Sequence, residues 1–134
     1  MGKVNGIEDL HVWQSARLLA LSIEDLIKSG ALESNKALKI QIQRSSISVV
    51  SNIAEGFGRG GNKEFINFLS MARGSLTEVL SQLILAYDFG YIPDDQFRTL
   101  RDSIENTGRL IGGMTRHLKR SALTGSKFRS ETGE

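Results

Sequence analysis

Residues 44–61, RSSISVVSNIAEGFGRGG, decide the fold, because they join a predicted helix to a glycine-rich turn. Apolar side chains recur every three or four residues over 38–56, which predicts a helix that ends at Gly56. The β-branched residues within 46–54 leave a strand as the local alternative, but the helical period of the longer segment favours the helix. The apolar positions are Leu38, Ile42, Val49 and Ile53.

The turn contains a G-x-G-x-x-G pattern at Gly56, Gly58 and Gly61. In a dinucleotide-binding fold this motif follows a strand and opens a helix. Here it follows a predicted helix, and the sequence offers no parallel strands. We therefore interpret the glycines as residues that adopt positive φ in a tight reversal between two helices, with Asn62 as the N-cap of the second helix.

The segment from about residue 63 to residue 89 is predicted to be a long helix with little charge. Between Phe65 and Tyr87 the only charged residues are Arg73 and Glu78. A surface helix of a monomeric bundle has a broad polar face, so we expect a second subunit to cover this one. One apolar stripe comprises Phe65, Phe68, Ala72, Val79, Ala86 and Phe89, and the other comprises Leu69, Leu76, Leu80, Leu83 and Tyr87.

Two further helices are predicted, over residues 8–29 and 93–121, because each segment repeats its apolar residues at helical spacing. Four helices with short connections predict an all-α protein, an antiparallel up-down-up-down four-helix bundle. We expect this single domain to occupy residues 1–121.

The last predicted helix contains Gly108, Gly112 and Gly113, which interrupt its apolar seam. Glycines inside a helix lower its stability, so they indicate either a close approach of a neighbouring helix or a weak point. Residues 122–134 are small and polar, and we expect them to form a disordered C-terminal tail.

Composition limits the class of protein. The chain has 134 residues, no cysteine and a formal net charge of +2. The lack of cysteine excludes a disulfide framework and a cysteine nucleophile. No apolar run of signal-peptide type is present, nor one of the roughly 18 residues that a membrane span needs. We therefore expect a cytoplasmic protein with no membrane partner.

The sequence predicts no enzyme, cofactor or metal site. The ends of a bundle could bring His11 and His117 together, but no third metal ligand is evident. Nucleophilic catalysis is not supported, because no base lies at a matching helical spacing from the serines of the central stretch, Ser45, Ser46, Ser48 and Ser51. A perturbed carboxylate in a pocket, at Glu55 or Glu78, would be needed to indicate catalysis.

Polar residues within the apolar hairpin of the second and third helices predict a structural network. We expect Glu55 and Glu78 to pair with Arg44 or Arg73 at a helix or subunit interface. A ligand site at these positions is the alternative. The network comprises Arg44, Ser48, Asn52, Glu55, Arg73, Ser75, Glu78 and Gln82.

Basic residues gather in two parts of the chain, which predicts a surface that contacts phosphates. The first group is Lys36, Lys39, Arg44, Arg59 and Lys63, and the second is Arg116, Lys119, Arg120, Lys127 and Arg129. No acidic residue interrupts the second group before Glu131. The alternative is a solvated face with a basic tail. In an oligomer the same patch would repeat and create a large positive field.

The sequence resembles the 23S rRNA intervening-sequence protein family over about residues 8–118. The most specific blocks are NIAEG at 52–56 and ARGS at 72–75, and VWQSA at 12–16 is similar to the family's opening. The chain departs from the family pattern at Gln43, where a second arginine is usual. It also departs at Ser45 and Ser46, often alanines, and at Val50, often proline.

This resemblance implies an antiparallel four-helix bundle that assembles as a ring-like homopentamer without enzymatic activity. Members are encoded within intervening sequences of bacterial 23S rRNA genes or elsewhere in genomes. Related proteins are accessory factors to the reverse transcriptase of diversity-generating retroelements, where a basic pentamer binds nucleic acid.

The leading hypothesis is therefore a non-enzymatic homo-oligomer that binds nucleic acid, RNA or DNA and most of all structured RNA. The candidate contacts are Lys36, Lys39, Arg44, Arg59, Lys63, Arg116, Lys119 and Arg120. The alternative is a protein–protein scaffold or accessory factor, for example to a reverse transcriptase, without direct RNA binding.

Overall fold

The computed structural model describes the backbone of residues 4–132 and the side chains of residues 4–121. A short 3-10 helix, η1, precedes four α-helices, and residues 4–132 contain no strand. The segment 46–54 is therefore helical, as its apolar period predicted. The elements are η1 (Ile7–Asp9), α1 (His11–Lys28), α2 (Lys36–Gly58), α3 (Asn62–Asp88) and α4 (Asp94–Thr132).

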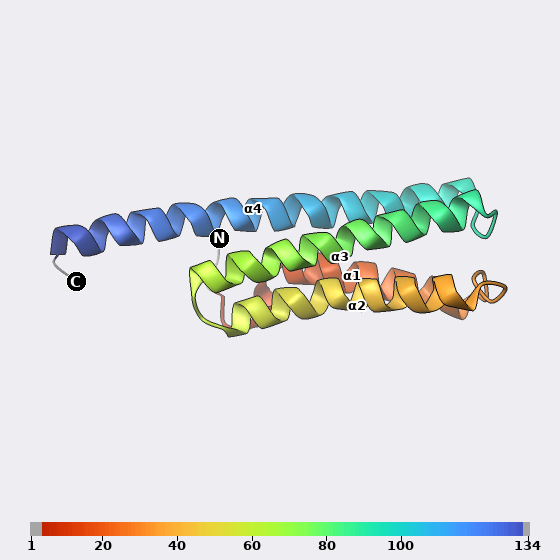
Figure 1. Cartoon of the computed structure of the whole chain (residues 1–134), viewed down its shortest axis with the longest axis horizontal. Helices are drawn as coiled ribbons and strands as arrows, with labels where there is room; N and C mark the ends of the chain where they lie inside the picture. The colour runs from red at the N-terminus through yellow and green to blue at the C-terminus, as the bar shows by residue number, and fades with distance from the viewer. Residues whose placement is uncertain (1–3, 133–134) are drawn as a thin grey trace.

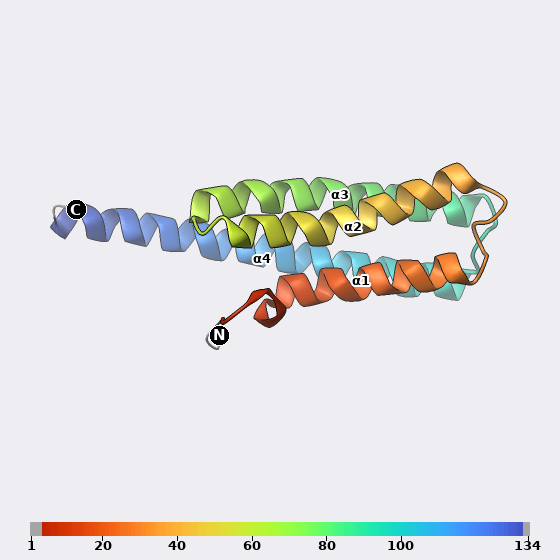
Figure 2. The same ribbon diagram turned by 90° about the horizontal axis from the view of Figure 1, so that it is seen from below.

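The helices form an all-α four-helix bundle. Their connections lie at alternate ends of the long axis, so successive helices reverse direction (Figure 1). Each helix packs on the next one in the chain, and α4 closes the bundle against α1. Figure 2 shows α4 extending beyond the end of the other helices on the side of the C-terminus.

The core is apolar along its whole length because every helix contributes a stripe of aliphatic side chains. Ile23 of α1, Ile42 of α2, Leu69 and Leu83 of α3, and Ile111 of α4 are all at most 1% exposed. Burial of each such side chain stabilises the fold by about 1.5–3 kcal/mol relative to an exposed one.

Helix ends follow the predicted signals in part. The Asn35 side chain accepts a hydrogen bond from the Leu38 backbone N–H at 3.0 Å and so caps α2. The predicted cap of α3 is wrong, because Gly61 occupies the N-cap position and Asn62 is already helical. The Asn62 amide group instead donates to the Leu118 carbonyl at 3.4 Å and so ties the start of α3 to α4.

Gly56 does not end its helix, contrary to the prediction. α2 continues to Gly58, and Gly56 is buried inside it. A Cβ at this position would lie 2.7 Å from Phe68 Cβ and 2.9 Å from Phe65 Cδ1. Of the turn glycines only Gly60 has positive φ, at 83°. Gly56 is therefore required by the close approach of α3 and not by backbone reversal.

The predicted domain boundary after residue 121 and the disordered tail remain predictions. The described backbone of α4 continues as helix to Thr132, whereas residues 133–134 and the side chains beyond Ser121 lie outside the described residues. Within the described part of the chain, no helix combines the length and apolar character needed to cross a bilayer.

Candidate nucleic-acid interface

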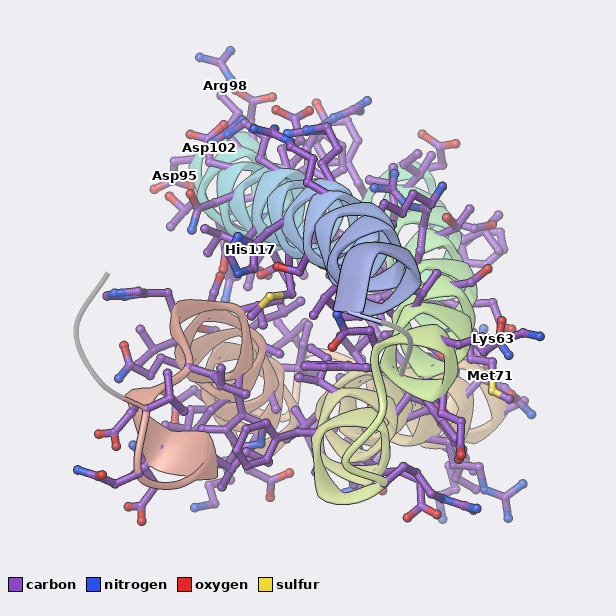
Figure 3. The ribbon with its side chains drawn as sticks, turned by 90° about the vertical axis from the view of Figure 1, so that its left-hand side faces the viewer. Lys63, Met71, Asp95, Arg98, Asp102 and His117 are labelled. Carbon is purple, nitrogen blue, oxygen red and sulfur yellow. The ribbon has the colours of Figure 1, made fainter. Side chains whose placement is uncertain are left out.

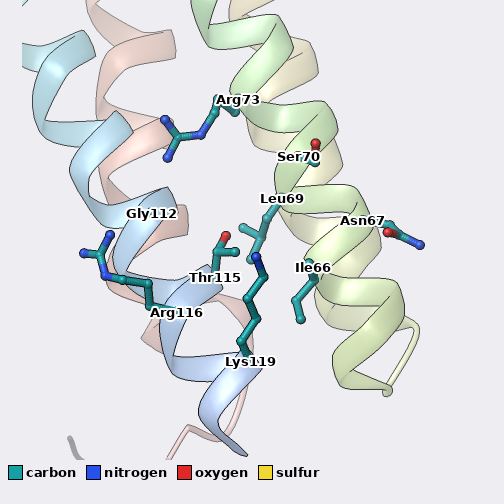
Figure 4. A pocket seen from close by; sticks show the side chains of 9 residues that line it. All are labelled: Ile66, Asn67, Leu69, Ser70, Arg73, Gly112, Thr115, Arg116 and Lys119. Carbon is teal, nitrogen blue, oxygen red and sulfur yellow. The ribbon is translucent and has the colours of Figure 1, made fainter. Parts of the chain in front are cut away.

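The candidate site is a groove of about 430 Å³ between α3 and α4, which we call the α3–α4 groove (Figure 4). Its charged lining consists of Arg73, Arg116 and Lys119, with no acidic side chain. Hydroxyl and amide groups from both helices complete the polar part, and the apolar part is aliphatic. The remaining lining residues are Ile66, Asn67, Leu69, Ser70, Gly112 and Thr115.

Two guanidinium groups meet beside Gly112, where the absence of a side chain leaves room for them. A Cβ on Gly112 would lie 3.0 Å from Arg73 Nη2 and 3.3 Å from Arg116 Nη1. Arg73 reaches from α3 across to α4, where its Nη2 donates to the Gly108 carbonyl at 3.5 Å (Figure 4). Two like charges that approach one point create a local positive potential that favours an anion.

The groove cations have no counter-ion within the described chain. None of Arg73, Arg116 and Lys119 forms an ion pair with another residue of 4–121. Their donors are thus available to an external anion, and charge-assisted hydrogen bonds to phosphate are among the stronger polar contacts. The arrangement therefore fits phosphate recognition.

Two predicted contacts, Lys39 and Arg59, are already paired. The Lys39 ammonium lies 2.7 Å from Glu33, and the Arg59 guanidinium lies 2.8 Å from Glu55. The hydrogen bond from Lys39, followed by its positive charge, lowers the pKa of the Glu33 carboxyl. A phosphate would have to compete with these carboxylates, so Lys39 and Arg59 contribute less than an unpaired cation.

The other predicted contacts are spread along the bundle. Lys36 begins α2 at the end opposite the α2–α3 turn, and Arg44 lies further along α2. Lys63 lies in the first turn of α3, at the same end as Leu118 of α4. Figure 3 shows Lys63 on the outward side of α3. One continuous basic surface therefore does not form on a single chain. The structure brings together Arg116 and Lys119, which sequence analysis had grouped, with Arg73, which it had not.

Arg73 is the residue whose position the sequence did not reveal. It was predicted to belong to the α2–α3 polar network, but its side chain points to α4 (Figure 4). The available signal was Gly112, a small residue in the last helix that permits close approach. Its partner across the groove could not be identified without knowing the rotation of α3 relative to α4.

Polar contacts between α2 and α3 form as a set of hydroxyl and amide bonds. The Ser48 and Ser75 hydroxyls lie 2.8 Å apart, and Asn52 Nδ2 donates to the Ser48 carbonyl at 2.9 Å. Ser45 donates to the Glu78 carboxylate at 3.3 Å. The Ser48–Ser75 and Ser45–Glu78 bonds link α2 to α3, and the Asn52 bond lies within α2.

The ion pairs expected in this network are not present within the chain. Glu55 pairs with Arg59 one helical turn away, and Glu78 accepts a hydrogen bond from a serine. Neither Arg44 nor Arg73 pairs with an acid among residues 4–121. The reason is geometric, since Arg73 faces α4 and Arg44 is exposed on the outside of α2.

The outward faces of α2 and α3 expose apolar side chains without an intramolecular partner. The exposed fractions are 45% for Ile40, 54% for Ile47 and 51% for Met71. On α3, the buried Oε1 atom of Gln82 has no hydrogen-bond partner among the described residues. By contrast, Figure 3 shows the charged residues Asp95, Arg98 and Asp102 on the outward side of α4. The α2–α3 outer face is therefore more apolar than this side of α4.

A second groove, between α1 and α4, contains both histidines. His11 and His117 line it together with Arg109 and Met114. The start of α1 therefore lies beside residues 109–117 of α4. The described residues contain no group of three or more side chains that could hold a metal ion, so the pair has no third ligand.

Comparison with known proteins identifies the class. The family model for the 23S rRNA-intervening sequence protein matches residues 8–113. The chain belongs to this family. No curated protein matches it.

A solved structure supports the fold. The crystal structure of a protein of unknown function from the S23 ribosomal protein family, from Bacteroides thetaiotaomicron VPI-5482, superposes with a TM-score of 0.71. The two chains are 24% identical, and the match covers 78% of this chain and 97% of the other. At this identity the likeness concerns the four-helix fold.

Proposed function

We propose that this protein is a non-enzymatic homo-oligomer that binds nucleic acid, structured RNA above all, through contacts to phosphate. The observation that carries the proposal is the meeting of Arg73, Arg116 and Lys119 in a groove without acid. Membership of a family named after 23S rRNA supports RNA over other anions. The side chains offer charge and hydrogen-bond donors, which suits positioning on a backbone more than recognition of bases.

Oligomerisation supports the same function because it would repeat the groove. Exposed Ile40, Ile47 and Met71 give the α2–α3 outer face the apolar character of a surface that is covered in the working assembly. A ring-like pentamer, which the family resemblance implies, would place five copies of the groove on one particle. Several weak phosphate contacts on one particle bind more tightly than their separate affinities suggest.

A salt series on RNA binding tests the proposal. We expect log K for an RNA hairpin to fall linearly with log salt, by about 0.7–0.9 per phosphate contact, because bound cations release counter-ions. Replacing Arg116 and Lys119 by glutamine should weaken binding and lower the slope by about one for each lost contact. The matched control replaces Arg98 and Arg101, which pair with Asp94 and Glu105. It should leave the RNA affinity and the salt slope nearly unchanged. A flat salt response of the wild-type protein would contradict the proposal.

A protein scaffold is the second candidate, for example an accessory factor to a reverse transcriptase. It is favoured by Leu18 and Leu21, which lie on the outward side of α1 with 60% and 50% of their surface exposed. Under this alternative, a Leu18→Glu variant should lose capture of a specific protein. Charge reversal of Arg116, Lys119 and Arg120 should leave any residual RNA affinity unchanged. A large loss of RNA affinity on charge reversal favours the first proposal.

A further inference from the structure

We infer that the α3–α4 groove holds a terminal phosphomonoester, the phosphate at an end of an RNA chain, in preference to the phosphodiesters of its interior. This inference rests on the proposed nucleic-acid function and names the chemical group that the groove takes. It assigns Arg73 and Arg116 to the same phosphate, with Lys119 as the third cation.

The guanidinium groups of Arg73 and Arg116 converge. A surface that follows a strand places its cations along a path, because successive phosphates are separated along the backbone. Here Arg73 Nη2 and Arg116 Nη1 approach one point on α4, 3.0 Å and 3.3 Å from the position of a Cβ on Gly112. Lys119 is three residues beyond Arg116, and its side chain extends into the groove from below in Figure 4. The approach of two guanidinium groups to one point, with a third cation in the same groove, fits one highly charged group.

The positive charge of the α3–α4 groove also favours a phosphomonoester. A phosphomonoester carries about −1.5 to −2 charges at pH 7 and offers three strong acceptor oxygens. An interior phosphodiester carries one charge. Three cations without an acid match the larger charge, and two planar guanidinium groups can each donate two hydrogen bonds to phosphate oxygens.

The hydroxyl groups of the groove are not equivalent. The Thr115 hydroxyl donates to the Ile111 carbonyl at 2.9 Å, so its proton is already used. The exposed Ser70 hydroxyl makes no hydrogen bond within the described residues, but Figure 4 shows it, like Asn67, on the side of α3 that faces away from α4. The donors of the site are therefore its cations.

The lining of the α3–α4 groove offers no aromatic surface on which a base could stack. Among the lining residues there is no aromatic side chain, and the apolar part consists of Ile66 and Leu69. Proteins that hold single strands usually stack bases on aromatic rings. The α3–α4 groove offers no such contact, so its affinity depends on the phosphate group itself.

The test compares RNA hairpins of one sequence that carry a 5′-phosphate, a 3′-phosphate or hydroxyls at both ends, by fluorescence anisotropy in competition. We expect an end-phosphorylated hairpin to bind the wild-type protein about tenfold more tightly than the hydroxyl form. The preference should disappear in Arg73→Gln. The Arg98→Gln variant, which changes a paired arginine outside the groove, should retain it.

Two neighbouring glycines provide a matched pair of variants with unchanged charge. In Gly112→Ala the ends of the Arg73 and Arg116 side chains would have to shift by a few tenths of an ångström, so we expect the preference for a phosphorylated end to fall, though by less than in Arg73→Gln. In Gly113→Ala the nearest atom is Arg116 Nη2 at 3.8 Å, an ordinary contact, so the preference should persist. Circular dichroism and sedimentation of each variant exclude unfolding as the cause.

The possible results distinguish a wrong terminal-phosphate assignment from a wrong proposal of RNA binding. Equal, salt-dependent binding of all three hairpins would overturn the terminal-phosphate assignment and leave RNA binding in place. Failure of every hairpin to bind would overturn the proposed function. If adenosine 5′-monophosphate binds through Arg73 while no hairpin does, the source is a free nucleotide and the assignment to an RNA end is overturned.

Discussion

Gly56 lies at a close contact between α2 and α3, and its role was misjudged from sequence. A glycine before a turn usually indicates positive φ, but this one is helical and buried against the side chains of Phe65 and Phe68. A single sequence does not distinguish a glycine needed for its backbone angle from one needed for its small size. Only the position of the facing helix decides between them.

At the residue scale, we therefore expect Gly56→Ala to destabilise the protein by about 1–3 kcal/mol, as over-packing of a tight core contact does. The Cβ would lie 3.3 Å from the Phe65 backbone, which cannot easily move. Gly58→Ala is the control, since nothing lies within 4 Å of its Cβ, and it should be neutral or stabilising. Denaturant unfolding measures both, and equal effects would show that close packing is not the reason for Gly56.

At the element scale, the junction of α3 and α4 is organised by Tyr87 and Asp94. The Tyr87 hydroxyl donates to the Asp94 carboxylate at 3.0 Å, and its ring stacks on Phe97 with centroids 4.4 Å apart. This hydrogen bond first, and then the negative charge of Asp94, raises the pKa of Tyr87. The junction therefore holds tyrosine in its protonated form.

The sign of the pH effect follows from this raised pKa. Protonated Tyr87 is favoured in the folded state, so its contribution to stability is complete below the unfolded pKa of about 10. That contribution is lost as pH rises through the higher folded value. In a Tyr91→Phe background, which leaves one tyrosine, we expect Asp94→Ala to lower the pH at which tyrosinate absorbance appears. Asp95→Ala should not shift it, and an unchanged titration in Asp94→Ala would contradict the assignment.

The helices themselves were predictable because burial of a helix face imposes a period on the sequence. The apolar positions Ile42, Val49 and Ile53 are all fully buried, as their spacing predicted. The polar seam of α2 and α3 was also predicted as a region, through Ser48, Asn52 and Ser75. The hydrogen-bond partners within this seam were not predictable, because a polar side chain on a helix can point towards either neighbouring helix. Arg73 points towards α4.

At the scale of the whole molecule, the apolar outer face of α2 and α3 argues for assembly. We expect Ile47→Glu, which places a charge in the centre of this face, to shift sedimentation from an oligomer towards a folded monomer. Thr99→Glu adds the same charge to the exposed side of α4 and should leave the assembly intact. A wild-type protein that sediments as a stable single copy would contradict the assembly and the repeated groove with it.

By itself the sequence determined the helical class, the number of helices, most of each core stripe and the presence of two groups of basic residues. These properties follow from local periodicity and composition, which act within one helix at a time. The tertiary structure alone decided that Arg73 lies near Arg116 beside Gly112. It also decided that Gly56 permits close contact between α2 and α3 and does not form a reversal of the chain. Both depend on how one helix is rotated and seated against another, and that geometry arises from packing of the whole core.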